Sequence, residues 1–91
     1  MADVIVTVKI MPSDVDTNLE KIKTAAGKEI INFKGRIVRE EIEPVAFGLK
    51  ALKITFSYDE NKGGTDYIEE RILKIDGVES VNVVDVRRAI G

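Results

Sequence analysis

The groups that could carry chemistry in this chain are carboxylates and amines, because it contains no cysteine and no histidine. That absence removes thiolate nucleophiles, disulfides, Cys/His zinc sites and imidazole acid–base catalysis. Two groups of carboxylates remain, Glu40, Glu41 and Glu43 in one segment and Glu69 with Glu70 in another. Nothing near them indicates the desolvation that tunes a catalytic carboxylate. We interpret them as solvated surface and expect a protein that is not an enzyme and holds no cofactor or metal.

A glycine pair ahead of a predicted helix, in Lys62-Gly63-Gly64-Thr65, is the nearest approach to a phosphate-binding loop. Glycines before a helix N-terminus can receive an anion. The full Gly-x-x-x-x-Gly-Lys-Ser/Thr pattern is absent, so we expect a capped helix start here and no nucleotide site.

An apolar loop, Pro-Val-Ala-Phe-Gly at 44–48, joins two segments that are rich in charge. Such loops usually carry polar turn residues. A large aromatic, Phe47, flanked by Val45, Ala46 and Gly48, is typical of a knob that enters a pocket of a partner protein. The alternative is that Phe47 folds back over the open end of the core. The loop is therefore a candidate partner-binding site whose exposure the sequence leaves open.

A basic pair, Arg87-Arg88, ends the last predicted strand. One interpretation is protection of a sheet edge; the other is a cation delivered to a phosphate or metal site of a partner. The chain has 14 basic and 16 acidic side chains, so a positive patch must be local, and nucleic acid is not an expected partner. We predict that this pair and the Phe47 loop lie at the same end of a sheet, where one partner would meet both.

Six elements must position these residues. Period-two alternation predicts strands over 3–11, 51–58 and 78–88, and the charged, weakly alternating segment 36–43 before Pro44 is predicted as a polar edge strand. Helical spacing predicts a helix over about 17–31, with Thr17 and Glu20 as a capping box, and a second helix that starts at Thr65 or Asp66 and stops before Gly77. The predicted inward positions of the two helices are Leu19, Ile22, Ala26 and Ile30, then Ile68, Ile72, Leu73 and Ile75.

The element order βαββαβ predicts an α+β fold, the ferredoxin-like sandwich, in which two helices cover one face of a four-stranded antiparallel sheet. The first and third strands should be central, and the charged strand before Pro44 should be an edge. Ninety-one residues fit one domain, 1–91. The chain enters a strand directly and has no span of ~20 apolar residues, so we expect a cytoplasmic protein without a membrane partner.

Two alternative functions share this topology, since the fold alone specifies none. An RNA-binding domain of this type stacks bases on sheet aromatics. Here Phe56 and Tyr58 share the register of Leu52 and Ile54, which suits the core instead. A small-ligand regulatory module would dimerise and form a pocket at the dimer interface. A metal-carrying version would need paired cysteines in the first loop, where this chain has Met11-Pro12-Ser13.

Three segments, in this order and at these spacings, resemble the guanine nucleotide exchange domain of translation elongation factor 1-beta, most closely its short archaeal form. They are the run Pro44-Val45-Ala46-Phe47-Gly48-Leu49-Lys50-Ala51-Leu52, then Gly64-Thr65-Asp66 with Glu69-Glu70, and Val78-Glu79-Ser80-Val81 continuing to Asp85-Val86-Arg87-Arg88. With length and element order, the resemblance covers essentially the whole chain.

The resemblance implies an exchange factor that promotes GDP release from the GTPase elongation factor 1-alpha during polypeptide elongation. It implies no covalent chemistry, and it implies that the bound GDP or GTP and the magnesium ion of the GTPase are contacted in trans. In the eukaryotic form of the family, a loop aromatic inserts into the GTPase and a lysine near the C-terminus reaches its magnesium site. Phe47 matches the aromatic position. Arg87 or Arg88 falls near the place of the lysine, which this chain lacks.

Overall fold

A computed structural model describes residues 3–89 of the chain. The elements follow the predicted order, and the ends of the predicted 1–91 domain lie outside the described residues. The strands are β1 (Asp3–Pro12), β2 (Arg36–Pro44), β3 (Lys50–Asp59) and β4 (Val78–Ala89). The helices are α1 (Leu19–Asn32) and α2 (Asp66–Leu73), with short 3₁₀ turns η1 (Ala46–Gly48) and η2 (Glu60–Lys62).

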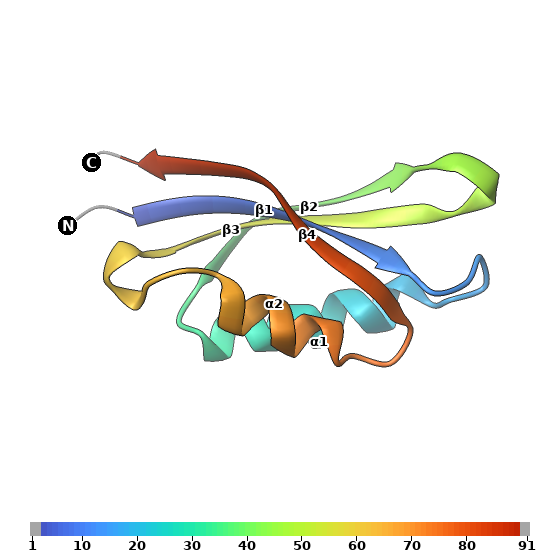
Figure 1. The fold of residues 1–91 in the computed structure, drawn as a ribbon, viewed down its shortest axis with the longest axis horizontal. Helices are drawn as coiled ribbons and strands as arrows, with labels where there is room; N and C mark the ends of the chain where they lie inside the picture. The colour runs from blue at the N-terminus through green and yellow to red at the C-terminus, as the bar shows by residue number, and fades with distance from the viewer. Residues whose placement is uncertain (1–2, 90–91) are drawn as a thin grey trace.

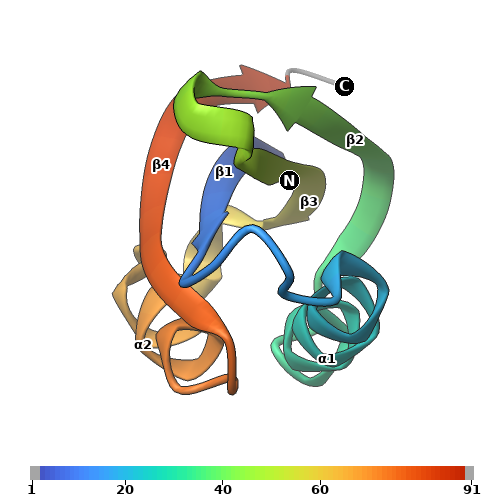
Figure 2. The same ribbon diagram turned by 90° about the vertical axis from the view of Figure 1, so that its right-hand side faces the viewer.

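The four strands form one antiparallel sheet in the order β2-β3-β1-β4. Figure 1 shows α1 and α2 together on one face, and Figure 2 shows the opposite face without a covering layer. The predicted α+β ferredoxin-like arrangement is confirmed, with β1 and β3 in the centre and β2 and β4 at the edges.

The core lies between the sheet and the two helices. Period-two alternation on β1 and β3 directs every second side chain towards the helices, and most of these side chains are fully buried or nearly so. The buried strand residues are Val6, Val8, Ile10, Leu52, Ile54, Phe56 and Tyr58, and the buried helix residues are Ile22, Ala26, Ile30, Ile68 and Ile72. The predicted inward position of Leu73 is wrong, because this last residue of α2 is half exposed.

The start of α1 differs from the predicted capping box. Asn18 is the N-cap, and its side-chain oxygen accepts from the backbone N–H groups of Glu20 and Lys21 at 2.9 and 3.3 Å. The Thr17 hydroxyl oxygen instead accepts from the Asp14 N–H at 3.2 Å. Asparagine is as good a cap as threonine, so the helix begins two residues later than predicted and leaves 13–18 as a loop.

No helix within the described residues 3–89 is long and apolar enough to cross a membrane.

Candidate functional site

The apolar loop forms the tip of the β2–β3 hairpin. The hairpin is closed by the Val45 N–H, which donates to the Leu49 carbonyl at 2.8 Å, and by the Leu49 N–H, which donates to the Ala46 carbonyl at 3.3 Å. Between these bonds the chain turns through Ala46, Phe47 and Gly48, and all three are exposed. Val45 is half-buried at the base of the tip.

The Phe47 side chain is 94% exposed, so the interpretation in which it covers the core is wrong. Its backbone is in the left-handed region, with φ 62° and ψ 30°, followed by Gly48 with φ 76°. A bulky residue in that region costs about 1–2 kcal/mol, and exposing an aromatic ring forgoes its burial. Neither feature helps the fold, and such strain concentrates at functional positions. The tip presents Phe47 outwards.

Arg87 and Arg88 point to opposite faces of β4. Arg88 is opposite Val4 of β1 in the sheet register, and so shares the helix-covered face, where its guanidinium pairs with Glu60 of η2. Arg87 is opposite Ile5 and shares the open face, where its Nε donates to the Asp85 carboxylate at 2.9 Å. Both arginines are mostly exposed, so each ion pair is easily exchanged for one with a partner.

The prediction that the Phe47 tip and the arginine pair share one end of the sheet is wrong. Figure 1 shows the hairpin at one end of the long axis and the end of β4 at the other. Neighbouring strands alternate in direction, so the start of β4 lies near the hairpin and its end lies beside the start of β1. Ser57 of β3 and Arg87 of β4 both lie opposite Ile5 of β1. Lys50, next to the hairpin tip, lies seven residues before Ser57 along β3, which at ~3.3 Å per residue is about 23 Å from Ser57. The tip lies farther still.

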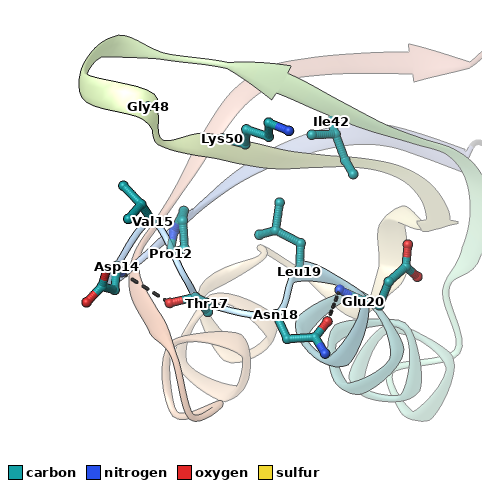
Figure 3. Close-up of a pocket in the computed structure, with 10 residues that line it drawn as sticks. All are labelled: Pro12, Asp14, Val15, Thr17, Asn18, Leu19, Glu20, Ile42, Gly48 and Lys50. Carbon is teal, nitrogen blue, oxygen red and sulfur yellow. Dashed lines mark hydrogen bonds between the residues drawn. The ribbon is translucent and has the colours of Figure 1, made fainter.

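A groove opens beneath the hairpin, between it and the loop that joins β1 to α1 (Figure 3). Its volume is about 450 Å³. Val15 and Leu19 point from the loop and the start of α1 towards the hairpin, while Ile42 and Lys50 line the opposite side. The other lining residues are Pro12, Asp14, Thr17, Asn18, Glu20 and Gly48.

The groove was not predicted from the sequence. Its clearest signal is Val15, a single apolar residue in the polar run from Ser13 to Asp16. A methyl group of Val15 lies 3.9 Å from the position that a Cβ on Gly48 would occupy, so the loop and the hairpin tip form one continuous surface. This surface includes two exposed apolar side chains, Val15 and Phe47.

The open face of the sheet is polar. At its centre the hydroxyls of Thr7 and Thr55 are 2.9 Å apart, and Lys9 pairs with Glu43 at 3.5 Å. The two aromatics of β3, Phe56 and Tyr58, lie on the helix-covered side as predicted. Across the strands as described, the open face therefore offers no aromatic platform for stacking bases.

Two titratable side chains of the described structure have a raised pKa. Burial raises the pKa of the Tyr58 phenol, whose hydroxyl donates to the Gly63 carbonyl at 3.0 Å. Hydrogen bonding to Glu29 raises the pKa of Arg71, which joins α2 to α1 on the surface. Within residues 3–89 no three carboxylates gather as a metal site would require.

Similarity in fold connects the chain to other small domains of known structure. It superposes on the ACT domain from the GTP pyrophosphokinase of Chlorobium tepidum with a TM-score of 0.62 at 16% identity, over 90% of this chain and 99% of that one. The C-terminal domain of the MgtC protein from Mycobacterium tuberculosis gives 0.64 at 8% identity, over 96% and 87%. At these identities the likeness shows the fold alone.

Similarity in sequence is closer and extends from end to end. The chain is 48% identical to elongation factor 1-beta of Methanosarcina barkeri, over 97% of this chain and 99% of the relative. It is 42% identical to the protein of that name in Methanococcoides burtonii, over 99% and 100%, and 42% identical to that of Sulfurisphaera tokodaii, over 97% of each. The model of the EF-1 guanine nucleotide exchange domain matches residues 5–89. The chain, with its exposed aromatic tip and basic strand end, belongs to the EF-1 guanine nucleotide exchange domain family.

Proposed function

We propose that this chain is a guanine nucleotide exchange factor that promotes GDP release from elongation factor 1-alpha, with the Phe47 tip and the end of β4 as its two contact regions. Family membership gives the activity and the GTPase as partner. The observation that carries the assignment of the contact is Phe47, a strained aromatic that is 94% exposed at a hairpin tip.

The Phe47 end supplies binding energy. An aromatic ring that enters a pocket removes about 150–250 Å² of apolar surface from water. Ala46 and Gly48 are small, so a pocket wall can close around the ring without meeting neighbouring side chains. Val45 supports the tip from below, half-buried at the closing hydrogen bond.

The end of β4 supplies charge. GDP is held in a GTPase by Mg²⁺ and by amide groups around the phosphates, so a cation brought to that site weakens the metal by repulsion. Arginine differs from lysine in its planar, forked donor groups, which favour phosphate or carboxylate oxygens. Because Arg87 and Arg88 face opposite sides of the sheet, a partner that lies on one face contacts the arginine on that face. Arg87 is the candidate for a partner lying on the open face.

The separation of the two regions sets the size of the contact. A partner that touches both must extend along most of the 42 Å long axis of the molecule. The exchange factor must also bind the nucleotide-free GTPase more tightly than the GDP form, since coupling between two ligands of one protein is reciprocal. Binding at two distant regions allows a small domain to hold one part of the GTPase while it disturbs another.

The proposal is tested by loading elongation factor 1-alpha with a fluorescent GDP analogue and following its release with and without this chain. We expect a rate that rises with the concentration of the chain and saturates. An unchanged release rate would refute the exchange activity.

Related parts of the proposal are a single exchange domain over 1–91, a cytoplasmic location with the translation apparatus, and action without covalent chemistry, direct nucleic-acid contact or a membrane.

A further inference from the structure

From the groove beneath the hairpin, we infer a third contact with the same GTPase: the groove receives an apolar side chain of the partner that has a basic residue next to it. The inference rests on the proposed function and names a second binding element at the Phe47 end. This chain would insert Phe47 into a pocket of the partner, and the partner would insert a side chain into the groove.

The apolar part of the groove has no partner within the described chain. Val15 is 57% exposed and Ile42 is 49% exposed, and Leu19 lies between them at the start of α1. These three side chains come from a loop, a strand and a helix, yet they converge on one hollow. A concave, partly apolar hollow of this kind is where a partner's side chain gains most from leaving water.

The groove adjoins the proposed contact. Gly48 follows Phe47 in the chain and also lines the groove, and Val15 approaches Gly48. A protein that encloses the Phe47 ring must therefore cover the mouth of the groove as well. An uncovered apolar hollow beside a bound ring would leave water in the interface, so filling it strengthens the contact.

Charge specifies the chemistry of the occupant. Asp14 lines the groove, and Asp16 lies two residues further along the same loop; neither forms an ion pair within residues 3–89. Glu20 is the second carboxylate of the lining, although it also pairs with Lys23. Lys50 is the cation on the hairpin side. The excess of carboxylates at the loop side favours a basic residue of the partner next to the buried apolar one.

The loop wall is held in place before binding. The Ser13 N–H donates to the Gly77 carbonyl at 2.8 Å, which ties the loop to the turn before β4. The Thr17 N–H donates to the Asp14 carbonyl at 3.2 Å, and the Asp14 N–H donates to the Thr17 hydroxyl at 3.2 Å. A wall fixed in this way loses little conformational freedom when a partner binds, which favours affinity.

The test compares two valines of equal exposure. Val15→Glu places a charge in the groove, and Val38→Glu places the same charge on β2, where Val38 is 58% exposed against 57% for Val15. We expect Val15→Glu to weaken binding to nucleotide-free elongation factor 1-alpha at least about tenfold and Val38→Glu to leave it within about twofold. Equal effects of the two variants, or wild-type affinity for Val15→Glu, would overturn the inference.

A second readout does not depend on the folding of a variant. In an NMR titration of the wild-type chain with the GTPase that follows methyl and aromatic signals, we expect the methyl signals of Val15, Leu19 and Ile42 to shift together with the ring signals of Phe47. Shifts of Phe47 without shifts of the three groove residues would overturn the groove while leaving the proposed function intact. If the wild-type chain does not bind the GTPase at all, the proposed function and this inference fall together.

Discussion

Phe47→Ala separates a binding role of this residue from a structural one, because the two roles predict opposite results. The ring is 94% exposed in the free protein, so its removal takes away almost no intramolecular contact. Alanine also occupies the left-handed backbone with the same kind of strain. We therefore expect the free energy of unfolding to change by less than about 0.5 kcal/mol.

The expected loss in binding is much larger. Burying an aromatic side chain removes about 150–250 Å² from water, which at ~25 cal/mol per Å² sets an upper bound of about 4–6 kcal/mol. Truncating a central aromatic anchor at an interface usually costs about 2–4 kcal/mol. At ~1.4 kcal/mol per factor of ten, Phe47→Ala should weaken binding to the GTPase about 30- to 1000-fold.

Two assays check this prediction together. Urea unfolding followed by circular dichroism gives the change in stability, and release of a fluorescent GDP analogue at several concentrations of the chain gives the change in activity. Ile31→Ala is the matched control, because Ile31 is another exposed, large apolar residue and lies on α1, away from the hairpin. Loss of more than about 2 kcal/mol of stability, or unchanged exchange, would show that the reasoning about Phe47 is wrong.

Three further predictions test other parts of the structure. Arg87→Ala and Arg88→Ala should each cost less than about 1 kcal/mol of stability, since their ion pairs are exposed. When the exchange rate is measured over a range of Mg²⁺ concentrations, the variant that lacks the arginine acting at the metal should exchange more slowly than the wild-type chain. Wild-type exchange rates for both variants at all Mg²⁺ concentrations would exclude a role of either arginine at the metal. Burial raises the pKa of Tyr58 above 10.0, so the folded chain keeps the phenol proton to a higher pH than the unfolded chain, and stability falls as pH rises from about 10 through the raised pKa. Urea unfolding at pH 8 and pH 11 should show a smaller loss of stability at pH 11 for Tyr58→Phe than for the wild-type chain. Equal losses of stability would contradict the raised pKa of Tyr58. Gly77→Ala should cost about 1–3 kcal/mol, because φ is 92° and the new Cβ would lie 2.9 Å from a methyl carbon of Thr17, whereas Gly64→Ala meets nothing within 4 Å and should change denaturant unfolding little.

The element order and the core could be predicted from the sequence because they follow from local periodicity. Alternating apolar residues on β1 and β3 determine which side chains face the helices, and Phe56 and Tyr58 were assigned to the core on that ground. Charges and Pro44 marked β2 as an edge strand. Element ends were less well determined, since Thr17 and Asn18 are both good helix caps and only the loop's hydrogen bonds decide between them.

The site depended on contacts that periodicity does not contain. The sequence drew attention to Phe47 because an apolar loop tip is unusual, but only the backbone of the hairpin decided that the ring points into solvent. Only the antiparallel register decided that Arg87 and Arg88 lie at the far end of the sheet and on opposite faces. The groove is the feature that the sequence predicts least, because Val15 and Ile42 lie in separate segments. They line one groove only because the sheet positions the hairpin above the loop. Residue types thus determined which groups were available for binding, and the three-dimensional arrangement of the strands decided which of them lie together.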